Sequence, residues 1–417
     1  MVRKDKNMKH LWALLLVVML LLTGCSAYPE VRDVFSGEEG SSPSAEDSPS
    51  HYPSHQAEES SDTQATVPSG DVWAEAAGRI PYFETKHFLK QLNTEQMTDF
   101  LVLYNAVQNF EQEVTYPYPL TKEENDALSE FLVYECPENM MYDREATYTY
   151  YANDGGLITS RTLVYCMDQT TYQDRMAQIT AELNSLDQEL AGLSDFDREV
   201  AVYRYIIDTN TYNRTAENAE NTWGLLFEGQ AKCDGIALTF KWLMDMAGIP
   251  NYILTGDLYD HSDGHAWNVI QIDGQFYDVD ITHDDMDLTD YQDAFIYGLL
   301  NVDRYTIRDQ YLIRDLYNAF NCPGAEDMSG CYHARMGTFV YAADSTNDMF
   351  IRQVQNAYQT GTDSFSFQFE TRNQFDDFLN NTQQYMDAAA AFTGAGFSLN
   401  WFYQEESLAF WCAVDFN

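Results

Sequence analysis

The residue types that could do chemistry together are a cysteine, a histidine and an aspartate, in that order along the chain. Cys233 stands in GQAKCDGIALTF, where a loop gives way to an apolar helical pattern, and His265 and Asp280 follow in GHAWNVIQIDGQFYDVDITHDD. A thiol at a helix N-terminus is favoured as thiolate, and a nearby imidazole can take its proton. A carboxylate behind the imidazole fixes its orientation. Such a set predicts a thiol that attacks an amide carbonyl, with free helix amides holding the oxyanion.

Two kinds of element must position these residues. The helical pattern from Cys233 to Ala247 ends at AGIPN, where a glycine and a proline stop a helix. Strand patterns follow over residues 251–259, 265–272 and 275–282. Alternation of side chains along the last two strands decides which residues share a face.

A two-residue turn sets the register of the predicted hairpin. Asp273 and Gly274 form that turn, so Ile272 faces Gln275 and position 267 faces 280. His265 and Asp280 then share one face as diagonal neighbours. We expect the apolar residues on that face to form the bed for the helix headed by Cys233. These are Trp267, Val269 and Phe276.

Three segments resemble the transglutaminase-like superfamily in content and order: EGQAKCDGIALTFKWLMDMAGIP, GHAWNVIQIDGQFYDVDITHDD and FIYGLLNVDRYTI. The resemblance covers about Ser194 to Leu312. It implies an α+β fold in which a helix carrying the cysteine packs on an antiparallel sheet carrying the histidine and the aspartate. By the resemblance Cys233 is the nucleophile, His265 the general base and acid, and Asp280 the orienting carboxylate.

The resemblance also implies a wider site. A second oxyanion donor lies upstream of the nucleophile in the family, and Gln230 and Trp223 are the candidates. Trp267 and His283 are expected at the cleft. The bacterial pattern often has tryptophan where Phe276 and His283 stand, which changes the cleft walls and leaves the three central residues intact. No cofactor and no metal site are expected.

The N-terminus predicts export. A basic start, an apolar run from Leu11 to Leu22 and then LTGC indicate a signal peptide over residues 1–24. LTGC resembles the lipobox of bacterial lipoproteins, which makes Cys25 the lipidation site. Residues 25–71 form an acidic linker rich in serine and proline that cannot fold. Residues 72–193 are expected to be a helical region with a hairpin, 194–316 the catalytic domain, and 317–417 a small α+β region.

The composition limits which partners the protein can bind and which roles its other cysteines can have. The 417 residues carry a formal net charge of −43, which disfavours binding to nucleic acid. In an oxidising compartment Cys322 could pair with Cys331, and Cys136 with Cys166. Cys412 is expected to be a buried strand residue.

The sequence therefore predicts a lipid-anchored enzyme on the extracellular face of a bacterial membrane. It would act on peptide or isopeptide amides, of which cell-wall peptide is one source, through a thioester. Hydrolysis is favoured over cross-linking because the sequence shows no dedicated amine site. The alternative is a surface binding or adhesion protein that uses the same domain as a scaffold, in which Cys233 is a small core residue.

Overall fold

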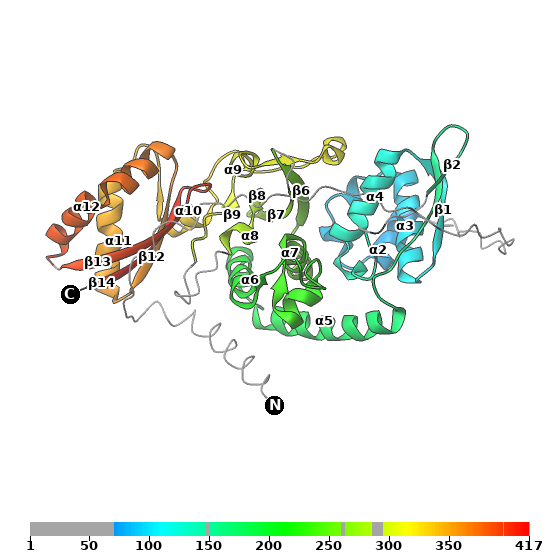
Figure 1. Ribbon diagram of the computed structural model, residues 1–417, viewed down its shortest axis with the longest axis horizontal. Helices are drawn as coiled ribbons and strands as arrows, with labels where there is room; N and C mark the ends of the chain where they lie inside the picture. The colour runs from blue at the N-terminus through cyan, green and yellow to red at the C-terminus, as the bar shows by residue number, and fades with distance from the viewer. Residues whose placement is uncertain are drawn as a thin grey trace, which may run out of the picture.

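The predicted hairpin lies in a five-stranded antiparallel sheet at the centre of the molecule (Figure 1). The computed structural model describes residues 71–144, 146, 150–259, 263–285, 295–394 and 396–416. The predicted signal peptide and Cys25 lie outside the described residues, as does all of the predicted linker except Asp71. No helix in the described ranges combines the length and apolarity needed to cross a membrane.

The central sheet has the strand order β10-β6-β7-β8-β9. Its strands are β6 (Asn251–Leu258), β7 (Gly264–Ile272), β8 (Gln275–Val279), β9 (Leu300–Val302) and β10 (Tyr311–Ile313). Ile272 pairs with Gln275, which confirms the predicted register. Asp273 and Gly274 have φ values of 53° and 84°, as a tight hairpin turn requires.

The helix headed by Cys233 packs on the opposite face of the sheet from the one predicted. This helix is α7 (Cys233–Met246). The Asn268 side chain donates to the Ala237 carbonyl at 3.0 Å, and Ala266 is buried against Cys233 in a small apolar cluster. Trp267 points to the other side, where its indole N–H donates to Asp278 at 2.8 Å. Both faces are apolar, so alternation alone could not say which one the helix covers.

The N-terminal region is helical and contains the predicted hairpin. Its helices are α2 (Val72–Arg79), α3 (Thr94–Gln108), α4 (Lys122–Tyr134), η1 (Phe83–Thr85), η2 (Leu89–Gln91) and η3 (Pro137–Asn139). Thr121 caps α4 in a capping box with Glu124. The hairpin, β2 (Tyr150–Ala152) and β3 (Ile158–Thr162), is joined by an unpredicted strand, β1 (Glu113–Leu120), in the order β1-β3-β2.

Two helices connect this region to the central sheet. They are α5 (Gln169–Glu189) and α6 (Asp195–Thr209), and Ser194 caps α6 by accepting from the N–H of Asp197. Short elements complete the middle of the molecule: β4 (Thr211–Tyr212), η4 (Gly224–Glu228), β5 (Gln230–Ala231), α8 (Ile281–Asp284), α9 (Arg304–Arg308), η5 (Asp315–Ala319) and α10 (Tyr332–Met336).

The N-terminal region and the central sheet share one hydrophobic core, which runs from Val72 to Ala325. A buried polar cluster joins them at the far end of α7. The Lys86 ammonium lies 2.6 Å from the Asp245 carboxylate, and both side chains are at most 1% exposed. Lys241 also binds Asp245, at 3.2 Å. The N-terminal region is therefore part of the same folded unit as α7.

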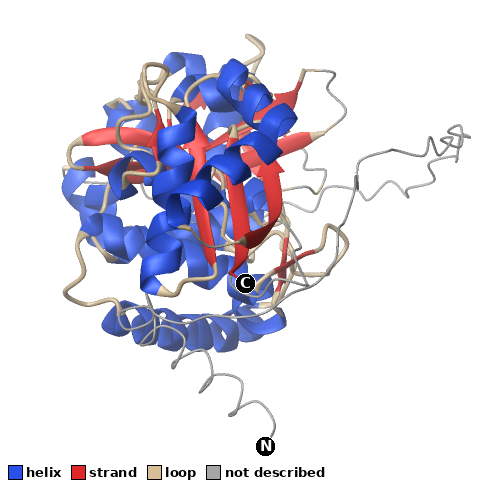
Figure 2. Cartoon of the chain, turned by 90° about the vertical axis from the view of Figure 1, so that its left-hand side faces the viewer, coloured by secondary structure: helices blue, strands red, loops and turns tan. Residues whose placement is uncertain are grey.

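The C-terminal region is an α+β unit with its own core, as predicted. Its elements are β11 (Phe339–Val340), α11 (Thr346–Thr360), β12 (Ser364–Phe369), α12 (Arg372–Thr393), β13 (Phe397–Gln404) and β14 (Ala409–Phe416). The strand order is β11-β12-β14-β13, and both helices pack on this sheet (Figure 2). The unit meets the middle of the molecule where Ile296 packs on Ala409 and Trp411.

The cysteines described by the structure are all free thiols. The pairing of Cys322 with Cys331 and that of Cys136 with Cys166 are therefore not seen. Instead the sulfurs contact backbone groups. Cys331 caps α10 by accepting from the Ala334 N–H, and Cys166 donates to the Met140 carbonyl at 3.4 Å. Cys412 is fully buried in β14, as expected for a core residue.

Candidate active site

Cys233 is the first residue of α7, and its thiol is almost covered. The residue is 6% exposed, and the backbone N–H of Ala266, the residue after His265, acts on the thiol to lower its pKa. Gly235 allows the preceding loop to cross the first turn of this helix, because a Cβ there would collide with the Ala219 carbonyl. The backbone thus holds Cys233 against Ala266 at the start of β7, in the cavity that His265 also lines.

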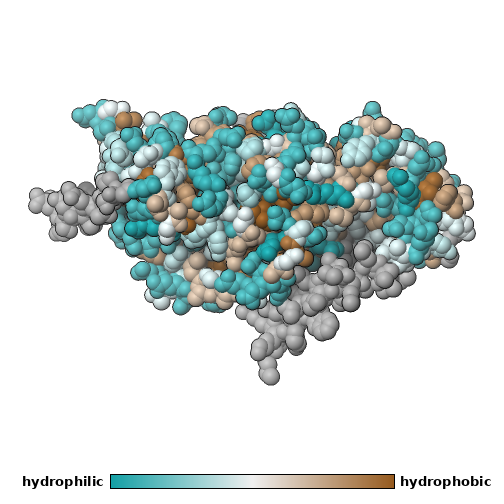
Figure 3. Space-filling view, turned by 180° about the vertical axis from the view of Figure 1, so that it is seen from behind, coloured by the Kyte–Doolittle hydropathy of each residue, from teal (hydrophilic) through white to brown (hydrophobic). Residues whose placement is uncertain are grey.

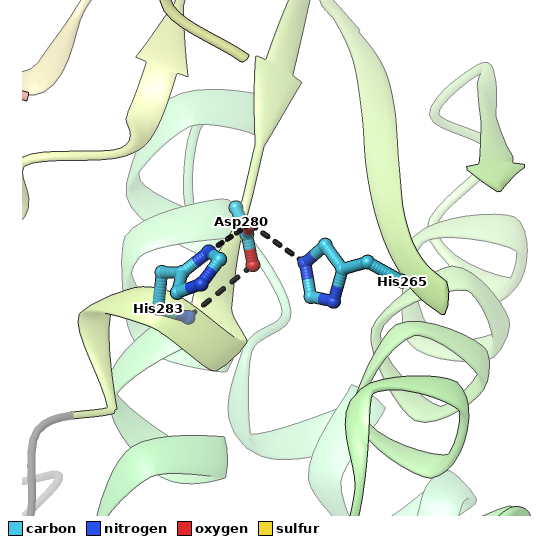
Figure 4. A group of neighbouring side chains, drawn as sticks. All are labelled: His265, Asp280 and His283. Atoms are coloured by element: carbon cyan, nitrogen blue, oxygen red, sulfur yellow. Dashed lines mark hydrogen bonds and ion pairs between the residues drawn. The ribbon is translucent and has the colours of Figure 1, made fainter. Parts of the chain in front are cut away.

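His265 and Asp280 form a direct hydrogen bond. His265 Nε2 lies 2.8 Å from Asp280 Oδ2, and both residues are buried (Figure 4). A carboxylate can only accept, so Nε2 carries the proton and Nδ1 keeps a free lone pair. Nδ1 points away from Asp280 (Figure 4). This tautomer is the one that can take a proton from a thiol.

Asp280 is held as an anion by its surroundings. It stands at the N-cap of α8, where its side chain accepts from the His283 N–H. Burial opposes ionisation, but the imidazoles of His265 and His283 outweigh it and hold the pKa of the Asp280 carboxyl well below its usual range. The carboxylate therefore serves as a fixed negative charge behind His265.

The thiol of Cys233 is protonated at neutral pH, contrary to the thiolate expected at a helix N-terminus. Burial raises its pKa to about 12, and the neighbouring Asp234 carboxylate adds to the shift. The Ala266 N–H and the Lys232 ammonium act in the opposite direction and do not compensate. The cost of burying a charge is larger than the helix dipole supplies. A base would therefore have to remove the proton during any reaction at this sulfur.

Cys233 and His265 line one cavity of about 450 Å³. Its walls come from two parts of the chain. Tyr212, Lys232 and Gly264 belong to the middle of the molecule, whereas Glu130, Tyr134 and Arg144 come from the N-terminal region. The polar part of the lining exceeds the apolar part, in keeping with the mostly hydrophilic surface seen in Figure 3.

Residues 184–281 match the family model described as the transglutaminase-like superfamily. This part of the chain is a transglutaminase-like domain. The match spans α6, α7 and the hairpin and ends one residue after Asp280. It begins within α5, ten residues before the predicted start of the domain at 194.

Several solved structures are also similar to the chain, at low identity. A TGase is 15% identical over 43% of this chain and 52% of its own, with a TM-score of 0.25. A candidate cysteine protease from Cytophaga hutchinsonii is 15% identical over 33% of this chain and 61% of its own, with a TM-score of 0.23. The periplasmic domain of TgpA from Pseudomonas aeruginosa is 15% identical over 33% and 62%, with a TM-score of 0.21. The chain thus spans less than two thirds of each, and no curated protein matches it.

The candidate oxyanion donors of the transglutaminase-like domain form their hydrogen bonds away from the cavity. The Gln230 Oε1 atom accepts from Asn213 at 3.0 Å, and the Trp223 indole donates to Glu228 at 3.1 Å. Neither residue is among the described residues that line the cavity. Trp267 is only 1% exposed and forms part of the core behind the site. His283, by contrast, lies beside Asp280 as a half-buried residue.

Two contacts in the domain escaped prediction. Tyr311 stacks on the His265 ring with centroids 4.6 Å apart, although β10 reaches this place only because it pairs with β6. On the other side of the thiol, Asp234 binds Arg144 at 2.8 Å and accepts from the Tyr134 hydroxyl. No local pattern could have placed residues of the N-terminal region beside the thiol.

One described group has the residue types of a metal site: His265, Asp280 and His283, whose nearest ligand atoms lie within 4.8 Å of one another. In this group both imidazoles turn a ring nitrogen toward the same carboxylate oxygen. Each of those nitrogens donates a proton to Asp280, so its lone pair is not free for a cation. The geometry is that of a hydrogen-bonded set.

Proposed function

We propose that the protein is a cysteine enzyme that cleaves peptide or isopeptide amide bonds through a thioester. The observation that carries the proposal is the 2.8 Å hydrogen bond between His265 and Asp280 in the cavity that Cys233 also lines. A thiol, an oriented imidazole and a buried carboxylate have the chemistry of acyl transfer. The transglutaminase-like match of this segment agrees with that chemistry.

The proposed reaction begins with a neutral thiol and a neutral imidazole. His265 Nδ1 takes the Cys233 proton as sulfur attacks the amide carbonyl, and Asp280 stabilises the imidazolium that forms. The imidazolium then protonates the leaving amine. The amides of the first turn of α7 lack intrahelical partners and can hold the oxyanion. Attack by water on the thioester, with His265 as base, releases the acid and restores the thiol.

The cavity suits a polar peptide segment better than an apolar acyl chain. Arg144, Arg214 and Lys232 lie on its walls together with acidic residues, so charged substrate groups would find partners there. We further propose that the substrate is a peptide or protein outside the cell, with cell-wall peptide as one source. Water is the favoured acceptor. The predicted lipid at Cys25 would hold the enzyme on the membrane.

Alkylation by iodoacetamide tests the reactivity of the thiol. We expect Cys233, which lines the cavity, to be labelled faster than the fully buried Cys412. The chemical test is His265→Ala, which should slow labelling of Cys233 about 10²-fold or more. Cys412→Ala is the matched control and should leave labelling of Cys233 unchanged. Equal rates at the two thiols, unaffected by His265→Ala, would refute the proposed chemistry.

Substrate identity is tested by mass spectrometry of peptide and wall-fragment libraries incubated with the protein. We expect cleaved products with wild type and none with Cys233→Ala. Products linked to an added amine, in place of hydrolysed ones, would identify the enzyme as an acyltransferase.

One observation favours the second candidate function, a binding protein that keeps the domain as a scaffold. Burial raises the pKa of the Cys233 thiol to about 12, so the resting site holds no preformed nucleophile. In a scaffold, His265→Ala would leave both alkylation of Cys233 and binding of a surface peptide unchanged. In an enzyme the same variant loses turnover while it still binds.

A further inference from the structure

The Asp280 carboxylate accepts hydrogen bonds from two imidazoles, and the second imidazole belongs to His283. His283 Nδ1 lies 2.8 Å from Oδ2 of Asp280, the oxygen that also binds His265 (Figure 4). The backbone N–H of His283 donates to Oδ1 at 3.3 Å. On the other side of the ring, Nε2 lies 3.1 Å from the Tyr311 hydroxyl. Both ring nitrogens thus have an oxygen partner, as a doubly protonated imidazole needs.

We propose that His283 is a positioning residue that clamps the Asp280 carboxylate and holds a positive charge behind it. The clamp has two points of attachment, one from the ring and one from the backbone. It fixes the rotation of the carboxylate, and through it the ring of His265. The inference rests on the proposed function, because it assigns His283 a part in proton exchange between His265 and Cys233.

The charges around His283 support this assignment. Burial disfavours its charged form, but the Asp280 carboxylate outweighs burial and raises the pKa of His283 to about 9. Glu406, in the turn between β13 and β14, and Asp284 on α8 act in the same direction. The Tyr311 hydroxyl on β10 lies 3.1 Å from the other ring nitrogen, where it can accept from a protonated Nε2. His265 is a further titratable neighbour, with ring centroids 5.0 Å apart.

A charged His283 changes what Asp280 can do for His265. Two positive charges 5 Å apart disfavour each other, and they would share a single carboxylate. His283 therefore competes with His265 for the Asp280 carboxylate, while His265 Nδ1, on the other side of the ring, can accept the thiol proton. Asp280 still orients His265, but it does not form an exclusive ion pair with it. The site is set for base catalysis from a protonated thiol.

Nitrogen NMR of ¹⁵N-histidine-labelled protein tests the charge directly. We expect both ring nitrogens of His283 to be protonated at pH 7.5 and to titrate near pH 9. His333 is the internal reference, since burial lowers its pKa to about 4 and it is neutral at pH 7.5. A neutral His283 at pH 7.5 overturns the proposal. Tyr311→Phe keeps a ring against His265 but removes the hydroxyl acceptor, and should move the His283 titration to lower pH.

The pH profile of Cys233 alkylation tests the effect on the site. His283→Asn retains a side-chain donor near the position of Nδ1 but carries no charge. We expect its acid limb to lie about one pH unit higher than that of wild type, because a nearby positive charge is lost. If the alkylation rate of the variant changes by the same factor at every pH and the acid limb does not move, the contact of His283 is purely structural and the proposal is overturned.

The two measurements separate this inference from the proposed function. If Cys233 is unreactive and its alkylation rate does not change in His265→Ala, the proposed function fails. The NMR measurement still reports the charge of His283 in that case. If Cys233 reacts and His283→Asn leaves the acid limb unmoved, the enzyme stands and the role of His283 fails.

Discussion

At the residue scale, one carboxylate carries much of the organisation of the site. Asp280 accepts from His265, from the ring of His283 and from the His283 backbone, and it caps α8. These roles differ in what they need. The cap needs only an acceptor oxygen, whereas the two imidazoles need a charge between them.

Asp280→Asn separates those roles. The amide oxygen keeps the cap, but an amide group beside His265 can favour the wrong tautomer. We expect the second-order rate of Cys233 alkylation, and turnover of any substrate found, to fall about 10²- to 10⁴-fold. The circular dichroism spectrum should be unchanged. An alkylation rate equal to that of wild type would show that Asp280 has no part in the reaction.

Thermal unfolding as a function of pH reports on His283. Its pKa rises from 6.5 in the unfolded chain to about 9 in the folded protein. Because the folded value is higher, the stabilisation is complete below pH 6.5 and is lost as the pH rises through 9. We expect the Tm advantage of wild type over His283→Asn to shrink across this window. An advantage that stays constant from pH 6 to pH 10 would contradict the charge assignment.

Much of this residue-scale geometry was predictable from sequence, and some was not. The Asp273-Gly274 turn and the alternation of β7 and β8 suffice to bring His265 to Asp280, because both are local rules. Tyr311 comes from a strand separated from β7 by β6. Its place on His265 depends on the order of strands, which no local pattern specifies.

At the element scale, α6 is fixed to the far edge of the central sheet by a buried carboxyl group. Glu199 on α6 accepts from the Asn301 side chain at 2.8 Å, while its Oε1 has no hydrogen-bond partner among the described residues. Burial raises the pKa of Glu199 to about 8. The group is therefore neutral in the folded protein at neutral pH.

Glu199→Gln keeps the shape and removes the titration. A raised folded-state pKa means that wild type loses stability as the pH rises from 4.5 through 8. We expect the variant to equal wild type near pH 5 and to be more stable by roughly 5 kcal/mol at pH 9. Urea denaturation at the two values measures the difference. If the variant and wild type differed in free energy of unfolding by the same amount at both pH values, Glu199 would ionise normally.

The packing of α7 shows where reasoning about elements from sequence stops. The helix and its boundaries follow from the apolar pattern and from the Gly248 and Pro250 stop. Its face on the sheet does not, because Val269 and Ile270, on opposite faces, are both fully buried. The deciding contact is the polar one between Asn268 and the Ala237 carbonyl. A pattern of hydrophobic residues carries no information about such a hydrogen bond.

At the scale of the whole molecule, the transglutaminase-like segment depends on the N-terminal region. Phe88 and Phe131 of that region lie in the same core as Tyr252 of β6, and Lys86 neutralises the buried Asp245. The family model matches only residues 184–281. A domain boundary drawn from that match would cut through the core.

Removal of residues 1–183 should therefore prevent folding. Loss of one partner of a buried ion pair alone costs about 3–5 kcal/mol, and the exposed apolar core adds to it. We expect the shortened chain to lack a cooperative thermal transition by circular dichroism and to bind a hydrophobic dye. Removal of residues 337–417 is the matched control, because that unit has its own core. A cooperative transition in the N-terminal truncation would contradict the shared core.

The C-terminal unit contributes no reacting group, yet it touches the backbone beside the carboxylate. The Gln404 side chain, at the end of β13, donates to the carbonyl oxygen of His283 at 3.0 Å. Replacing the C-terminal unit with one from another protein would therefore also change a hydrogen bond to the backbone of the site. A graft without an amide at that position would free the peptide bond next to the second imidazole, so the identity of one residue in the C-terminal unit bears on the backbone of the site.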